Sequence, residues 1–250
     1  MPFTDLAPWL LAQANRFETP AFLADDPLGM VRAFDDPDDR EVFGLFAAVL
    51  AWGRRATIRA SLLRLAERMD ARPARFVRDA TPARAEAALA GFVHRTFSSA
   101  DAVGLTFALR DVRAAHGSLG RLVGAHAGDD IGPGLDALAG ALLASPHAPR
   151  RKHLGHPATG SAAKRLAMYA RWMTRPGDVD LGQWSDVDAR ALVIPLDVHT
   201  GRQARRLGLL TRTTDDWRAV EELTAACRAI CPDDPARLDF ALFGLGAYGE

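Results

Sequence analysis

The chain has 250 residues, of which 48% are hydrophobic and 25% charged, and its 31 basic and 31 acidic residues cancel. This composition excludes a disordered chain, a fibre and a disulfide-stapled mini-domain, and the zero net charge argues against indiscriminate binding of polyanions. No linker rich in serine, glycine or one sign of charge divides the sequence. We therefore expect residues 1–250 to form a single helical domain with two lobes.

The sequence carries no signal for a membrane or for export. Its first residues lack the basic segment of a secretory signal, and its longest apolar stretch, Val42 to Gly53, is shorter than the roughly 20 residues that span a bilayer. We expect a cytoplasmic protein with no membrane partner. The only cysteines, Cys227 and Cys231, are too few for a disulfide framework or a four-thiolate cluster, and we interpret them as small side chains on one helix face.

Apolar residues recur at helical spacing along nearly the whole chain, and no stretch alternates as a half-buried strand would. The acid- and proline-rich residues 25–41 have the composition of helix starts. Helical repeats follow in segments that proline and glycine separate: 42–50, 58–65, 135–142, 166–173, 220–227 and 240–243. The predicted fold class is all-α, with about ten helices.

Residues 191–194 are the one candidate strand, and an extended run before a helix fits them equally well. Pro195 ends this run, and Asp197 follows two residues later. Asp197 directly precedes a helical segment, so its position suits the N-cap of that helix.

The basic residues are unevenly distributed. The stretch from His147 to Arg212 has twelve basic and five acidic residues, a net charge of +7, and the rest of the chain balances it. Such a stretch is typical either of a solvated face or of a phosphate-binding surface.

Lysine is rare, because Lys152 and Lys164 are the only two lysines among the 31 basic residues. An arginine meets any need for a fixed positive charge, whereas a lysine can lose its proton and attack an electrophilic carbon to form a Schiff base. Asp197 is the natural partner of Lys164, since a carboxylate held by helix N–H groups stays ionised and can stabilise a cationic sugar or take a proton from water. The other interpretation of Asp197 is a plain helix cap.

Several segments resemble a known family. Residues 194–202, Ile-Pro-Leu-Asp-Val-His-Thr-Gly-Arg, are similar to the segment of helix-hairpin-helix DNA glycosylases that holds their catalytic aspartate. Residues 239–246 resemble the helix that closes that domain, and residues 46–58 resemble the helix and loop that push a side chain into DNA. Residues 160–166, 171–173, 195–197 and 239–242 also look like those of an uncharacterised bacterial family of this length.

The spacing of the two candidate catalytic residues differs from that in most such glycosylases. Lys164 lies 33 positions before Asp197, a longer separation that is more like that of archaeal 8-oxoguanine DNA glycosylases, whose lysine lies inside the helix. A second register would put the lysine position near Ala162, and a site in that register has no nucleophile.

The resemblance implies base-excision repair of double-stranded DNA by a monomer associated with the nucleoid, without a cofactor or metal site. A damaged nucleotide is flipped into a pocket between the lobes, Lys164 attacks C1′, and Asp197 stabilises the developing charge. Trp52 and Arg54 would fill the gap in the duplex. The phosphates of the DNA would be bound by Arg150, Arg151, Lys152, Arg202, Arg205 and Arg206. The flipped base would lie in a pocket formed by Tyr169, Trp172, Trp184 and His199.

Two other functions stay open at this point. A DNA-binding protein could keep the glycosylase fold without catalysis, because a fold does not determine chemistry. A metal-dependent hydrolase is the third possibility, although the spacing of its candidate ligands matches no paired-histidine motif. Those ligands are His147, His153, His156, Asp197 and His199.

Overall fold

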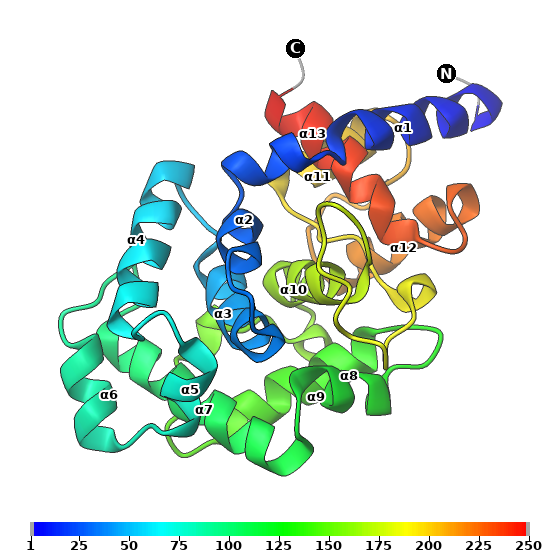
Figure 1. The fold of residues 1–250 in the computed structure, drawn as a ribbon. Coiled ribbons are helices and arrows are strands. Elements are labelled where there is room, and N and C mark those ends of the chain that lie inside the picture. Colours follow the sequence, from blue (N-terminus) through cyan, green and yellow to red (C-terminus); the bar gives the residue numbers. More distant parts are fainter. Residues whose placement is uncertain (1–2, 249–250) are drawn as a thin grey trace.

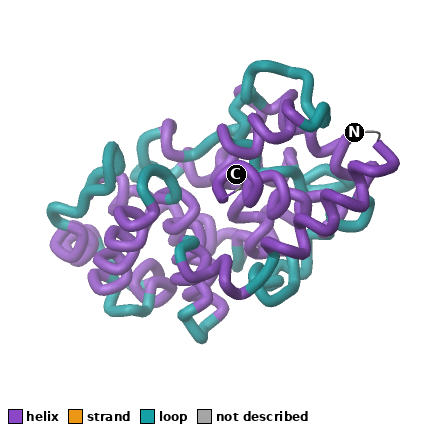
Figure 2. Tube along the Cα trace, turned by 90° about the horizontal axis from the view of Figure 1, so that it is seen from above, coloured by secondary structure: helices purple, strands orange, loops and turns teal. Residues whose placement is uncertain are grey.

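The computed structural model describes residues 3–248, and within them the chain is all-α: helices are joined by loops and turns, without a strand (Figure 2). Of the candidate strand, Ala191 ends the short 3-10 turn η4 (Ala189–Ala191), and the residues after it up to Asp197 belong to no helix or strand, with extended backbone at Leu192 and at Asp197. The second interpretation of that run is therefore the right one. None of the helices in the described part of the chain is long and apolar enough to cross a bilayer.

One set of helices forms the left and lower parts of the molecule in Figure 1. Its centre is α3, whose residues 41–50 are all buried, which explains why this segment has no polar face in the sequence. The helices of this set are α2 (Pro27–Arg32), α3 (Pro37–Leu50), α4 (Arg55–Arg68), α5 (Pro73–Arg78), α6 (Pro82–Leu89), α7 (Ser99–His116), α8 (Leu119–His126) and α9 (Gly132–Ala144).

A second set lies at the upper right of Figure 1, where α13 packs against both α1 and α11. Between the two sets, in the middle of the view, α10 (Lys164–Thr174) packs on α3. The second set comprises α1 (Phe3–Phe17), α11 (Val198–Arg206), α12 (Trp217–Ile230) and α13 (Leu238–Tyr248). The described residues hold thirteen α-helices rather than the predicted ten or so. Helices as short as α2 and α5, with six residues each, span too few turns to produce a periodic pattern.

The acid- and proline-rich residues 25–41 form helix starts, as predicted. Asp26 caps α2 by accepting a hydrogen bond from the Leu28 N–H at 2.9 Å, and Asp36 caps α3 in the same way through the Asp38 N–H. A proline occupies the first turn of each helix, where its missing N–H costs nothing.

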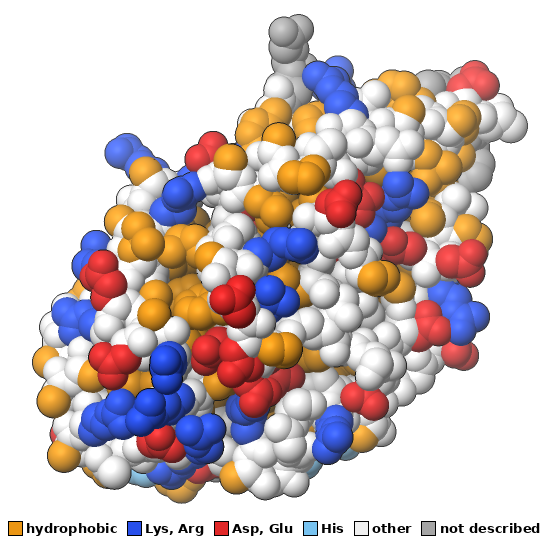
Figure 3. Space-filling view, viewed as in Figure 1, with side chains coloured by type: hydrophobic (Ala, Val, Ile, Leu, Met, Phe, Trp, Pro, Cys, Tyr) orange, Lys and Arg blue, Asp and Glu red, His pale blue; other side chains and the backbone are white. Residues whose placement is uncertain are grey.

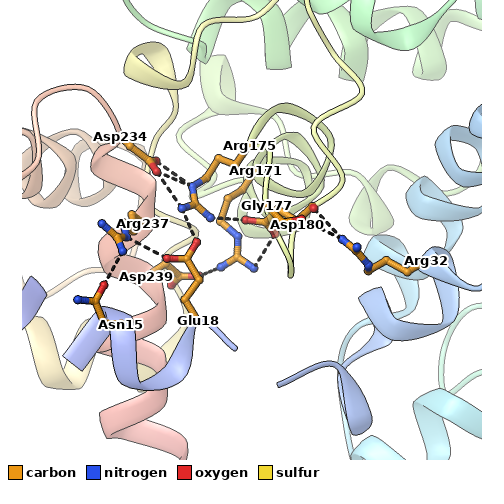
Figure 4. A network of polar contacts seen from close by, with 10 residues as sticks. All are labelled: Asn15, Glu18, Arg32, Arg171, Arg175, Gly177, Asp180, Asp234, Arg237 and Asp239. Atoms are coloured by element: carbon orange, nitrogen blue, oxygen red, sulfur yellow. Dashed lines mark hydrogen bonds and ion pairs between the residues drawn. The ribbon is translucent and has the colours of Figure 1, made fainter. Parts of the chain in front are cut away.

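A network of charged side chains, buried at Arg175 and Asp180 and partly exposed at its edge, joins the second set of helices to α10 (Figure 4). Arg175, directly after α10, forms ion pairs with Asp180, with Glu18 at 2.6 Å and with Asp234 at 2.8 Å. Glu18 in turn accepts a hydrogen bond from Arg237 in the turn η5 (Pro235–Arg237) at 2.9 Å. The network fixes the end of α10 against the segments that flank α1 and α13.

Candidate active site between the two sets of helices

A pocket of about 980 Å³ opens between the two sets of helices. The first set contributes residues around α2 and the loop from α3 to α4, including Asp26, Trp52 and Arg55. The opposite wall comes from the starts of α10 and α11 and from α13. Segments far apart in the sequence therefore meet here.

Lys164 and Asp197 both line this pocket, and Lys164 Nζ lies 3.7 Å from Asp197 Oδ2. Their side chains are 26% and 20% exposed, so each is accessible yet partly shielded from solvent. The structure thus brings together the two residues that the sequence analysis paired across 33 positions.

The two carboxylate oxygens of Asp197 have different partners. Oδ1 accepts hydrogen bonds from the N–H groups of His199 at 2.9 Å and Thr200 at 3.0 Å, which confirms the predicted N-cap of α11. Oδ2 is the oxygen that faces Lys164. The cap holds the side chain in one orientation and leaves one oxygen for the pocket.

Lys164 is the first residue of α10, and the residue before it has an unusual backbone. Ala163 lies in the left-handed region with φ +45°, a conformation that costs a residue with a Cβ about 1–2 kcal/mol. The neighbouring loop is tightly packed, since a Cβ added to Gly155 would lie 2.7 Å from Ala163 Cα. Ser161 Oγ accepts the Ala163 N–H at 3.1 Å. Such backbone strain often marks a functional position.

Asp239 is a site residue that the sequence analysis missed. It lines the pocket from the first turn of α13, and its Oδ2 accepts a hydrogen bond from Arg171 Nη1 at 2.5 Å while its Oδ1 accepts one from Thr200 Oγ1 at 3.3 Å. Burial raises the pKa of Asp239 to about 6, the Arg171 charge opposes this rise, and the Asp197 charge adds to it. Its signal in the sequence is a lone acid at the start of an otherwise apolar helix.

Asp26 is a second acid in the pocket that the sequence analysis treated only as part of a helix start. Burial raises its pKa, and the Leu28 N–H and the charges of Arg171, Lys164 and Arg55 oppose that rise. One of its oxygens is used in capping α2, as described above. The residues that line the pocket therefore include four aspartates, three arginines and two lysines.

An aromatic wall closes one side of the pocket. The Arg55 guanidinium lies over the rings of Phe243, at 5.8 Å, and Tyr248, at 4.6 Å, and donates a hydrogen bond to the Tyr248 hydroxyl. These contacts connect α4 of the first set with α13 of the second.

The predicted base-stacking residues are placed mainly in the core. Tyr169 and Trp184 pack edge to face at 5.1 Å, are buried, and do not line the pocket. Each has its own partner in Glu41: the Tyr169 hydroxyl donates to the backbone carbonyl at 2.8 Å, and Trp184 Nε1 donates to Oε1 at 3.0 Å. Trp172 lines the pocket but is only 1% exposed, and His199 lines its exposed edge.

The two residues predicted to fill a gap in DNA also differ in placement. Trp52 is half-buried, with the guanidinium groups of Arg95 and Arg165 over its ring at 4.7 and 5.5 Å, so it lines the pocket rather than protruding from the surface. Arg54 is exposed at the N-cap position of α4.

The predicted phosphate contacts fall into two groups. Arg150 is held by Asp101, and Arg205 forms a 2.6 Å ion pair with Asp215, so both charges already have protein partners. The remaining four predicted contacts are exposed and form no ion pair within residues 3–248. These four are Arg151, Lys152, Arg202 and Arg206. On the face of the molecule seen in Figure 3, basic and acidic side chains are interspersed.

The candidate metal ligands are dispersed. His153 lies near Asp101 at 3.5 Å, and His156 lies near Asp136 at 3.6 Å. In the part of the chain that the structure describes, no three His, Cys, Asp or Glu side chains are grouped so that they could hold a metal ion. The geometry gives no support to the metal-dependent hydrolase.

Comparison with known proteins gives one finding. A family model described as "Protein of unknown function (DUF2400)" matches residues 26–248, which include Lys164, Asp197 and every other residue that lines the pocket except Phe22. No curated protein and no solved structure matches the chain. The match covers far more than half of the sequence, and the chain therefore belongs to the DUF2400 family.

Proposed function

We propose that the protein is a base-excision enzyme that acts on damaged double-stranded DNA, with Lys164 as the nucleophile and Asp197 as the stabilising carboxylate. The observation that carries the proposal is the 3.7 Å separation of Lys164 Nζ and Asp197 Oδ2 in a pocket open to solvent. Covalent catalysis requires near-contact geometry of this kind.

The chemistry proceeds in three steps. Lys164 attacks as the neutral amine, after its extra proton passes to Asp197 or to water, and forms a bond to C1′ while the bond from C1′ to the base nitrogen breaks. The leaving base takes that electron pair and a proton from the attached amine. Opening of the sugar, with the ring oxygen accepting a proton from solvent, gives a protonated Schiff base, and loss of a proton from C2′ then expels the 3′ phosphate.

The pocket suits a flipped nucleotide in size and chemistry. Its volume of about 980 Å³ lies within the roughly 300–1,000 Å³ of most ligand pockets. The indole N–H groups of Trp52 and Trp172, both at the pocket, have no acceptor among the described residues. Because buried polar groups are normally paired, this supports a ligand that brings acceptor atoms. Lys152 is exposed at the rim of the pocket, and Arg54 is exposed next to the lining residues Gly53 and Arg55. Phosphates of the DNA strand would lie at these two side chains.

Borohydride trapping on duplexes that carry different damaged bases tests the nucleophile. Borohydride reduces the Schiff base, so the wild-type protein should form a covalent adduct with DNA. The adduct should disappear in Lys164→Ala and persist in Lys152→Ala, a matched control because Lys152 is the only other lysine. Base release without an adduct would instead indicate that Asp197 activates water.

The same duplexes test the aspartate. Asp197→Asn keeps an oxygen that can cap α11 but removes the charge, so we expect nearly unchanged duplex binding and base release slower by about 10²-fold or more. Tight binding to duplexes without release of any base from the wild-type protein would contradict the proposal and favour a DNA-binding protein without catalysis.

A further inference from the structure

A ring of polar contacts starts and ends on α10 and passes through the candidate site. Lys164 faces Asp197 Oδ2, and Asp197 Oδ1 accepts the Thr200 N–H at 3.0 Å. The Thr200 hydroxyl donates to Asp239 Oδ1 at 3.3 Å, and Arg171 Nη1 donates to Asp239 Oδ2 at 2.5 Å. Arg171 lies two turns after Lys164, so the ring links α10, α11 and α13 and then closes.

The part of this ring away from the pocket opening, formed by Arg171, Thr200 and Asp239, is buried from solvent. Arg171 is 3% exposed, Thr200 is fully buried and Asp239 is 6% exposed. Polar contacts in such surroundings are weakly screened, and they hold their geometry more firmly than contacts in water. Asp239 is the one member of the ring that uses both carboxylate oxygens to join two other helices.

We propose that Asp239 is the positioning residue of the Lys164–Asp197 pair, which it holds through Thr200 on one side and Arg171 on the other. Its importance for catalysis rests on the proposed function, whereas the coupling of Asp239 to Lys164 does not depend on it. Thr200 supplies one of the two N–H groups that orient Asp197. Arg171 fixes α10, and hence Lys164, relative to α13.

The coupling should be visible as a pH effect on Lys164. The pKa of Asp239 is raised to about 6, so this carboxylate takes up a proton as the pH falls through 6 and no longer balances the Arg171 charge. The charged and titratable groups around Asp239 come from three helices: Lys164 and Arg171 of α10, Asp197 of α11 and Cys227 of α12. On the other side of Arg171 lies its second partner, Asp180, and the charge of Glu18 acts on Asp180 in turn.

The low lysine content allows a direct measurement. A protein labelled with ¹³C-lysine gives two Cε signals, one from Lys164 and one from Lys152. We expect the Lys164 signal to change with a midpoint near pH 6, and this step to be lost in Asp239→Asn. The Lys152 signal should show no such step. A Lys164 step that persists in Asp239→Asn, or that is missing from the wild-type protein, would overturn the proposal.

A matched control comes from the far end of the same network. Asp234 pairs with Arg175 (Figure 4), and no hydrogen bond or ion pair joins its side chain to Arg171 or Thr200 within residues 3–248. Asp234→Asn therefore removes an acid of the network outside the ring, and the Lys164 step should remain. Loss of the step in Asp234→Asn would show that any change in the network suffices, which would also overturn the proposal.

A second bond of the ring provides a test that keeps every charge and does not need Asp239→Asn to fold. Thr200→Val removes the hydroxyl, so we expect the Lys164 signal at pH 7 to move and Thr200→Ser to return it. With a duplex that the wild-type protein cleaves, Thr200→Val should slow adduct formation about tenfold at unchanged duplex affinity. An unmoved signal in Thr200→Val contradicts the positioning role. A wild-type protein that forms no adduct contradicts only the proposed function.

Discussion

At the scale of single residues, Asp197 combines a structural and a chemical task. Its Oδ1 caps α11 while its Oδ2 faces Lys164, so a substitution can separate the two tasks. Asp197→Ala removes the cap and should lower the free energy of unfolding by about 1 kcal/mol, whereas Asp197→Asn should lower it by much less. Urea unfolding of both variants measures the difference. Equal losses in the two variants would show that the charge, rather than the cap, stabilises this helix.

Asp239 should make stability depend on pH in a direction opposite to most ion-paired acids. Its pKa is raised from 3.8 to about 6 in the folded protein, so the folded state binds this proton more tightly than the unfolded chain. The resulting stabilisation is complete below about pH 4 and is lost as the pH rises through 6, by about 1.4 kcal/mol for each unit of pKa difference.

The measurement compares the wild-type protein with Asp239→Asn, because all other titrating groups are common to both. The free energy of unfolding of the wild-type protein minus that of Asp239→Asn should fall from pH 4 to pH 7. A difference that is constant over this range would contradict the raised pKa.

At the scale of elements, the start of α10 places Lys164 at the cost of backbone strain. Ala163 has φ +45°, a region that glycine occupies readily. We expect Ala163→Gly to leave the free energy of unfolding unchanged or raise it by up to about 1 kcal/mol, and Ala163→Val to lower it. Thermal unfolding of both variants checks this order. Destabilisation by glycine would mean that the buried Ala163 methyl group contributes more than the strain costs.

The sequence predicts some of these elements well, because the relevant signals are local. The Asp-Pro helix starts and the Asp197 cap depend on neighbouring residues, and the structure confirms both. Helical periodicity identifies a buried face but not what lies opposite it. For this reason the sequence analysis assigned Tyr169 and Trp184 to a base pocket, whereas both side chains are buried against Glu41, more than 120 positions earlier in the chain. Asp239 was missed because only the tertiary fold brings it to Thr200 and Arg171.

At the scale of the whole molecule, net charge along the sequence is a poor guide to the surface. Seven of the twelve basic residues between His147 and Arg212 form ion pairs within the described chain, and five of them pair with acids outside this stretch, so its net charge of +7 is mostly compensated in space. Phosphate contacts are expected from exposed basic residues that form no ion pair, of which Arg54 and Lys152 lie closest to the pocket.

Removal of those charges should change the salt dependence of duplex binding. In the double variant Arg54→Ala, Lys152→Ala, the slope of log affinity against log salt concentration should become shallower by about 0.9 for each phosphate that the protein no longer neutralises. Arg190→Ala is the control, because Arg190 is also exposed to solvent but is paired with Asp188 at 2.5 Å. Equal slopes for the wild-type protein and the double variant would exclude a DNA backbone at this position.

The packing of α1 on α13 also has a consequence for synthesis on the ribosome. The apolar face of α1, formed by Leu6, Leu10 and Ala14, is buried in the finished protein, but its partner helix starts only at Leu238. At about 5–20 residues per second, the ribosome needs some ten to forty seconds to make the chain between them. During that time this face lacks its permanent cover, and transiently exposed apolar surface of this kind is what makes a nascent chain prone to aggregation and what chaperones protect.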